Sequence, residues 1–151
     1  MRHAEAETGM GYERDFDRKL TAQGISKLHR LNKVLTEKNI QYDLLIKSPA
    51  QRTMQTAQVI SAGLPVAEEL VKTTVYESSL EKLLEIILAL PDPLEHVLLV
   101  GHNPSISALL MYLADDFNVS LTTGMMAVIT FDLPAWNMIT KGSGSLSEVL
   151  Q

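Results

Sequence analysis

The chain has 151 residues, of which 46% are apolar and 21% are charged, a composition typical of one globular domain. Its formal net charge of −5 argues against nucleic-acid or membrane-surface partners, because these select a basic face. The absence of cysteine excludes disulfides, thiolate metal sites and a cysteine nucleophile. We expect a single domain over residues 1–151 and, since no apolar run is long enough to cross a bilayer, a cytoplasmic protein.

Hydrophobic periodicity predicts helices that alternate with short strands through the middle of the chain. Thr21, Ser48, Ser79 and Asn103 are the expected N-caps of four of these helices. In chain order we expect a polar loop at 5–19, a helix at 21–38, a strand at 43–47, a helix at 48–62, a strand at 71–75, a helix at 79–90, a strand at 96–100, a helix at 103–113, a strand pair at 126–132 and 136–139, and a Gly/Ser loop at 141–145 before a last helical turn. This alternation predicts an α/β fold with a mostly parallel sheet.

Cationic or imidazole side chains stand at three points of this acidic chain. Arg2-His3 opens the sequence, Arg52 follows the strand at 43–47 by about one helical turn, and His102 comes directly after the strand at 96–100. The carboxyl ends of parallel strands share one edge of a sheet, and helix N-termini at that edge favour anions. The sequence therefore predicts a local pocket for a small multivalent anion such as phosphate.

The same residue types can carry out phosphoryl transfer. An arginine fork binds phosphate oxygens bidentately, and two forks would stabilise the charge that develops in the transition state. A neutral imidazole nitrogen can attack phosphorus in line, and a second imidazole can donate a hydrogen bond to the transferring group. With arginine and histidine supplying positive charge, the chemistry requires neither a metal nor a cofactor. The pair Asp15 and Asp17 has the spacing of a magnesium-dependent phosphatase motif, but it lies in a polar loop rather than after a strand.

Three segments in this order resemble the histidine phosphatase superfamily. They are Arg2-His3 with the following Ala and Glu, residues 48–57 around Ser48-Pro49 and Arg52, and residues 100–104 around His102. Within that superfamily the short chain is similar to the small phosphohistidine phosphatases of SixA type, and residues 17–24 resemble the segment after the family's first loop. The resemblance implies a phosphoglycerate mutase-like fold, with three αβα layers around a central, mostly parallel sheet.

The resemblance also implies roles for individual residues. His3 would be the nucleophile, Arg2 and Arg52 would bind phosphate, and His102 would complete the catalytic set. Arg18 and Asn103 would border the substrate. Glu77 is the candidate general acid, with Glu5 a weaker one.

The start of the chain departs from the family pattern, because family members have an apolar strand before Arg-His. Here Met1 directly precedes that pair, so we expect the first strand to be short or missing. An apolar stretch encoded immediately before Met1 would restore it.

The resulting expectation is a metal-independent phosphatase that works through a covalent phosphohistidine and acts on a phosphorylated protein, with phosphohistidine as the expected phosphorylated side chain. A small phosphate ester is the alternative substrate. A phosphate-binding regulatory module without turnover is the alternative of a different class.

Overall fold

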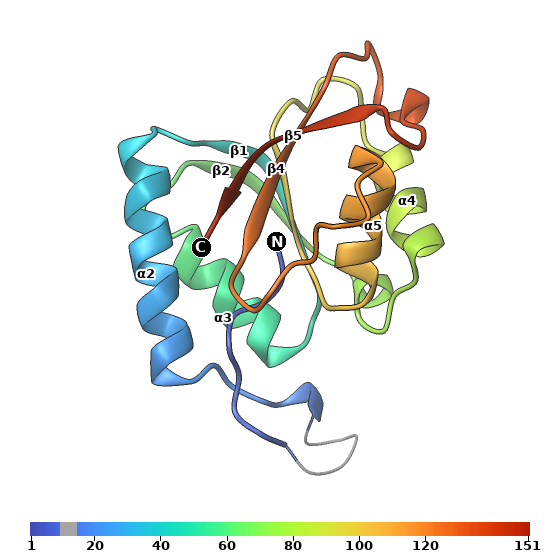
Figure 1. Ribbon diagram of the computed structural model, residues 1–151. Helices are drawn as coiled ribbons and strands as arrows, with labels where there is room; N and C mark the ends of the chain where they lie inside the picture. The colour runs from blue at the N-terminus through green and yellow to red at the C-terminus, as the bar shows by residue number, and fades with distance from the viewer. Residues whose placement is uncertain (10–14) are drawn as a thin grey trace.

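The computed structural model describes residues 1–9 and 15–151. A parallel sheet of strand order β2-β1-β3 lies at its centre, with β1 at Tyr42–Lys47, β2 at Val66–Val71 and β3 at Val97–Val100. Helices α2 (Ala22–Glu37) and α3 (Gln51–Ile60) cover one face, and α4 (Leu80–Leu88) and α5 (Ser105–Ala114) cover the other (Figure 1). This arrangement confirms the predicted three-layer α/β architecture.

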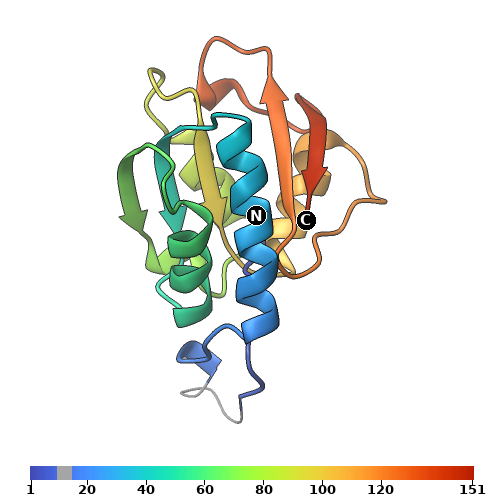
Figure 2. The same ribbon diagram turned by 90° about the vertical axis from the view of Figure 1, so that its left-hand side faces the viewer.

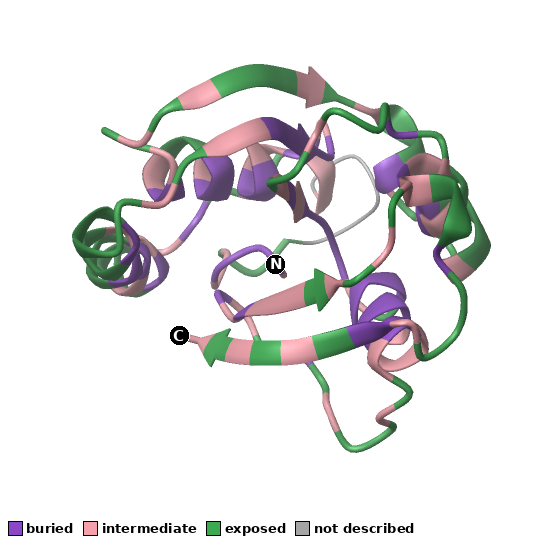
Figure 3. Cartoon of the chain, turned by 90° about the horizontal axis from the view of Figure 1, so that it is seen from above, coloured by how far each residue is buried: buried purple, intermediate pink, exposed green. Residues whose placement is uncertain are grey.

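Alternation along β1 explains how one strand contributes to both layers. Leu45 packs into the core below α2 and α3, whereas Leu44 and Ile46 pack into the core below α4 and α5. Successive strand residues point to opposite faces of a sheet, so a continuous apolar run is the signature of a strand buried on both sides. Figure 3 shows the buried surfaces of the surrounding helices turned toward the sheets.

The C-terminal part differs from the prediction. Strand β4 (Met126–Phe131) was expected, but its antiparallel partner is β5 (Gly144–Leu150), where we predicted a loop and a helical turn. Residues 136–138 form the 3-10 helix η2, in which the Trp136 indole N–H donates to the Leu94 carbonyl. The strand predicted at 71–75 is also wrong: β2 ends at Val71, and Thr73–Val75 form the 3-10 helix η1.

Residues 1–3 lie between the two sheets. Where a short or missing first strand was predicted, they form only an isolated parallel bridge between Arg2 and Gly101. The Met1 amine donates to the Leu99 carbonyl at 2.8 Å, and the Met1 carbonyl accepts from Gly101 at 3.1 Å. On the other side the Arg2 amide donates to the Met125 carbonyl at 3.1 Å. Beyond this contact β3 and β4 separate, as Figure 2 shows, and a cavity of about 530 Å³ lies between them. Leu98, Leu99, Met126, Val128 and Leu150 are among the residues that line it.

An extended apolar segment of four residues joined to the amino group of Met1 should raise the melting temperature by several degrees. Each apolar side chain that the cavity buries contributes about 1.5–3 kcal/mol, which exceeds the ordering cost of about 1–2 kcal/mol per residue only if the segment packs as a strand. Thermal unfolding measures the effect, with a Gly/Ser segment of equal length as the control. Equal melting temperatures for the two extensions would contradict this account of the cavity.

Candidate active site

Hydrogen bonds from three parts of the fold hold the backbone around His3. The His3 amide donates to the Gly101 carbonyl at 3.1 Å, and its carbonyl accepts from the Gly124 amide at 2.9 Å. The Ala4 amide donates to the Thr56 hydroxyl of α3 at 3.0 Å. The position of this imidazole is therefore fixed by three parts of the fold: the end of β3, the segment before β4, and helix α3.

A close approach between α2 and the N-terminal segment adds a fourth constraint. The Thr21 amide donates to the Glu5 carbonyl at 3.0 Å, and a Cβ built on Gly24 would lie 2.4 Å from the same carbonyl oxygen. No real Cβ tolerates that distance, so only glycine at position 24 lets α2 pack here. The predicted Thr21 cap is present: its hydroxyl accepts from the Gly24 amide at 3.0 Å.

The fold brings the first and third sequence segments into contact. The rings of His3 and His102 lie 5.2 Å apart between centroids, and only 7% and 8% of these residues is exposed. The other two histidines, His29 and His96, are exposed. The chain thus has one buried pair of imidazoles, at the edge of the sheet where β1 and β3 end.

The hydrogen bond of His3 determines which of its nitrogens is free. Its Nδ1 lies 2.7 Å from the Ala4 carbonyl oxygen, which can only accept. Nδ1 therefore carries the proton, and the neutral ring keeps its lone pair on Nε2.

Burial and nearby cations keep both imidazoles neutral. The pKa of His3 is lowered to about 4, mainly by burial and also by Arg52, Arg2 and Arg18, against the opposing effect of the Ala4 bond. Burial likewise lowers the pKa of His102 to about 3, with Arg52 as the next cause. A low dielectric and adjacent positive charge both disfavour an imidazolium.

Four buried nitrogen atoms converge here without a hydrogen-bond partner among the described residues. They are the Nε atoms of Arg2, Arg18 and Arg52, and Nδ1 of His102. Buried polar groups are rarely left unpaired, because each costs about 1–3 kcal/mol. A cluster of such nitrogens, with arginine charges beside it, is suited to an anion with several oxygens.

Asp15 already neutralises part of this positive charge. Its carboxylate lies 3.1 Å from Nη2 of Arg52 and 3.2 Å from Nη1 of Arg18, and it accepts from the Tyr76 hydroxyl at 3.1 Å. Burial alone would raise the pKa of Asp15, but Arg52, Tyr76 and Arg18 hold it below its usual value. The carboxylate therefore stays ionised and competes with any other anion for Arg52.

The remaining predicted residues lie around this cluster in different ways. Asn103 is not an N-cap: α5 begins at Ser105, and the Asn103 amide donates to the Leu121 carbonyl at 2.9 Å while its oxygen accepts from the Ser107 hydroxyl. Glu77 is exposed and follows Tyr76 directly, with a left-handed φ of 49°. The Glu5 carboxylate accepts from the Thr21 hydroxyl at 3.2 Å.

Sequence reasoning missed two contacts to the His102 ring. The Tyr76 ring meets it edge-on at 5.5 Å, and Tyr76 also lies 5.9 Å below the Arg52 guanidinium. Ser48, predicted as an N-cap, instead places its Oγ 2.9 Å from His102 Nε2, and α3 begins later, after Ala50. The position of Ser48 at the end of a strand was the one sequence feature that could have indicated its place in the site. No sequence feature indicated the place of Tyr76.

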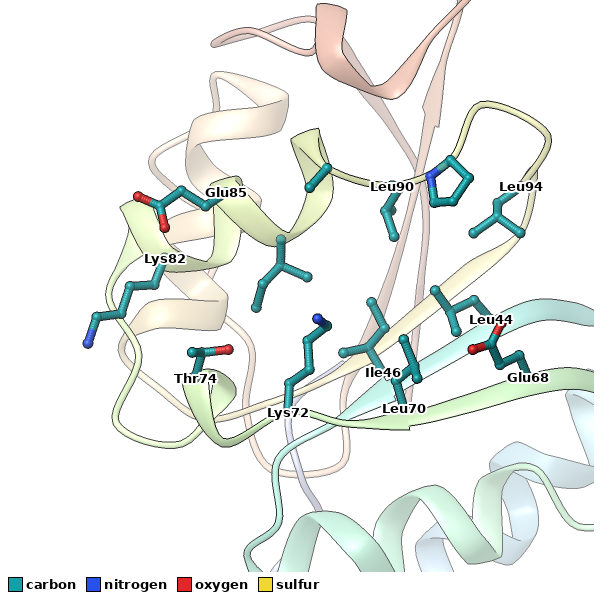
Figure 4. A pocket seen from close by; sticks show the side chains of 13 residues that line it. Leu44, Ile46, Glu68, Leu70, Lys72, Thr74, Lys82, Glu85, Leu90 and Leu94 are labelled. Carbon is teal, nitrogen blue, oxygen red and sulfur yellow. The ribbon is translucent and has the colours of Figure 1, made fainter.

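A second hollow lies away from the imidazole pair. It has a volume of about 490 Å³ and an apolar floor that includes Leu44, Ile46 and Leu70, with Lys82 and Glu85 of α4 at its rim (Figure 4). None of its lining residues belongs to the cluster around His3 and His102. The convergence of charge and orphaned nitrogens, rather than cavity size, therefore locates the candidate active site.

We expect neither buried histidine to titrate in the range of a free imidazole. Above about pH 4 the His3 ring should stay neutral, so any kcat that depends on the unprotonated ring should fall only below that value rather than near about 6.5, the ordinary imidazole value. An NMR pH titration of the His3 and His102 imidazole signals measures both pKa values. A midpoint near 6.5 for His3 would contradict the buried, neutral state.

Comparison with known proteins defines the class. The model of the histidine phosphatase superfamily (branch 1) matches residues 1–74, which confirms the resemblance inferred from the sequence. This match and two similar phosphatase structures at 25% identity indicate a phosphatase, which is a hydrolase. No curated protein matches the sequence.

Three of the similar solved structures carry the name SixA. Two are provisionally named phosphohistidine phosphatases SixA: one from Nakamurella multipartitia (25% identity, TM-score 0.80, covering 100% of this chain and 92% of the other) and one from Agrobacterium tumefaciens (25% identity, TM-score 0.81, covering 100% and 95%). A third is the protein histidine phosphatase SixA complexed with tungstate, with 21% identity, a TM-score of 0.84 and coverage of 100% and 94%. Within residues 1–9 and 15–151, no helix is long and apolar enough to cross a membrane.

Proposed function

We propose that the protein is a metal-independent phosphohistidine phosphatase in which His3 forms a covalent phosphohistidine. The observation that carries this proposal is the buried pair of neutral imidazoles beside Arg2, Arg18 and Arg52. The free Nε2 lone pair of His3 supplies the nucleophile, and the arginines supply the positive charge that a metal would otherwise provide.

The proposed reaction proceeds in two balanced steps. In the first, His3 Nε2 forms a bond to phosphorus while the bond between phosphorus and the substrate's imidazole nitrogen or ester oxygen breaks, and the leaving group takes up a proton. In the second, water attacks phosphorus and gives up a proton to the group that protonated the leaving group, the bond to His3 breaks, and inorganic phosphate leaves. Arg2, Arg52 and His102 hold the phosphoryl oxygens in both steps. Glu77, exposed next to Tyr76, is the proposed proton donor.

A phosphorylated protein side chain is the proposed substrate. The SixA-type names of the similar structures support it, as does the short chain. Phosphoramidate bonds also suit a site without an obvious strong acid, because the leaving imidazole is readily protonated at neutral pH.

Hydrolysis of three substrates tests the proposal: a protein carrying phosphohistidine, a phosphoramidate and an aryl phosphate. We expect the highest kcat/KM for the phosphohistidine protein, and loss of all turnover in His3→Gln. A preference for the aryl phosphate would indicate a phosphatase of small esters. Binding of tungstate without turnover of any substrate would indicate a regulatory module and overturn the proposal.

A further inference from the structure

Ser48 is the residue through which the end of β1 contacts the second imidazole. It is fully buried, at 0% exposure, and its Oγ accepts a hydrogen bond from the Ala50 amide at 3.2 Å. The same Oγ lies 2.9 Å from Nε2 of His102. A hydroxyl has one proton to donate, so the direction of the contact with His102 depends on which ring nitrogen is protonated.

Counting donors and acceptors separates the two tautomers of His102. If Nε2 carried the proton, Ser48 Oγ would accept twice, and its own proton would have no acceptor among the residues that the structure describes. Nδ1 would then be an unprotonated acceptor that is buried and also lacks a hydrogen-bond partner among the described residues. If Ser48 donates to Nε2, every group is paired except the N–H at Nδ1. The second arrangement leaves one orphan rather than two, and each orphan costs about 1–3 kcal/mol.

The surroundings of Nδ1 favour the same tautomer. The other orphaned nitrogens of the site are arginine Nε atoms, which are donors, and the positive charges of Arg52 and Arg2 act on His102 alongside the negative charge of Asp15. An anion bound among them would accept a hydrogen bond from Nδ1–H but would be repelled by a lone pair on Nδ1. The low pKa of His102 means that this tautomer, and not an imidazolium, is present at neutral pH.

We infer that Ser48 is a positioning residue that fixes His102 as the Nδ1–H tautomer, so that the neutral ring donates a hydrogen bond to an oxygen of the phosphoryl group. The inference rests on the proposed function for the identity of that anion. It explains how an uncharged histidine can act as a permanent donor.

Two measurements that need no turnover test this role. Long-range ¹H–¹⁵N NMR of the imidazoles reports the tautomer directly, and we expect the Nδ1–H pattern for His102 at pH 7. Titration with inorganic phosphate and with tungstate reports the donor strength. In Ser48→Ala we expect the tautomer to shift toward Nε2–H or a mixture, and anion affinity to fall by about tenfold, the scale of one lost hydrogen bond to a charged group.

Ser105→Ala is the matched control. Ser105 is also buried, but its hydroxyl donates to the backbone carbonyl of His102 at 2.9 Å rather than to the ring. We expect Ser105→Ala to keep the Nδ1–H tautomer and the anion affinity, which separates the effect on the ring from the loss of any buried hydroxyl nearby.

The outcomes are decisive in both directions. An Nε2–H pattern for His102 in the unmodified protein overturns the inference, even if Ser48→Ala fails to fold. So does a Ser48→Ala variant that retains the Nδ1–H pattern and full affinity. If the unmodified protein shows the expected tautomer and binds phosphate but hydrolyses nothing, the proposed function fails while the role of Ser48 stands.

Discussion

Replacing His3 with glutamine should lower kcat by at least about 10⁴-fold, the scale expected when the nucleophile of a covalent mechanism is removed. Glutamine is neutral, and its amide can still donate to the Ala4 carbonyl that now accepts from Nδ1. It cannot attack phosphorus. The variant should therefore bind inorganic phosphate or tungstate within a few-fold of the unmodified protein while turnover is lost.

His29→Gln is the matched control, because His29 is exposed on α2 and away from the site. We expect it to retain full kcat and KM. Steady-state rates on a phosphohistidine protein, with circular dichroism to confirm folding, provide the comparison. Turnover in His3→Gln within tenfold of the unmodified protein would show that another group is the nucleophile.

Replacing Arg52 with alanine should lower kcat/KM by about 10²- to 10³-fold, as when a donor to developing charge is removed. Arg52 is 6% exposed, lies in the first turn of α3 and influences the pKa of both buried imidazoles. Arg52→Lys should recover only part of the loss, since an ammonium group keeps the charge but lacks the planar fork. Arg30→Ala, on the exposed face of α2, should leave kcat/KM unchanged.

Replacing Asp15 with asparagine should raise the affinity for anions, whereas Arg52→Ala should lower it. Removing the carboxylate that pairs with Arg52 and Arg18 frees both guanidinium groups for an incoming phosphate. Calorimetric titration with tungstate should then show tighter binding in Asp15→Asn and weaker binding in Arg52→Ala. Weaker binding in both variants would mean that Asp15 supports the anion site rather than competing for it.

Sequence reasoning reached the site through strand ends. Parallel strands with continuous apolar runs are easy to recognise, and residues that follow them meet at one edge, which is how His102 and Arg52 could be expected near His3. Interactions that depend on side-chain direction could not be read in the same way. Ser48 has the residue type and position of an N-cap, and only the three-dimensional arrangement turns its hydroxyl toward an imidazole.

The prediction of strands β2 and β5 failed because their local composition is not typical of a buried strand. Strand β2 is an edge strand whose Glu68 and Glu69 are exposed, so it lacks the apolar run that marks β1 and β3. Strand β5 contains Gly144, Ser145 and Ser147, which are not typical strand formers, although its exposure alternates residue by residue as expected for a strand with one solvated face. In both cases a neighbouring strand, rather than local propensity, determines the structure.

The central claim is that phosphate becomes covalently attached to His3. Rapid-quench mixing with a phosphohistidine protein, followed by alkaline digestion and peptide mass spectrometry, tests it most directly. The account predicts a phosphoryl group on the peptide that contains residue 3, formed and lost at rates compatible with turnover, and absent in His3→Gln. Steady turnover with no phosphoryl group on that peptide at any quench time would contradict it.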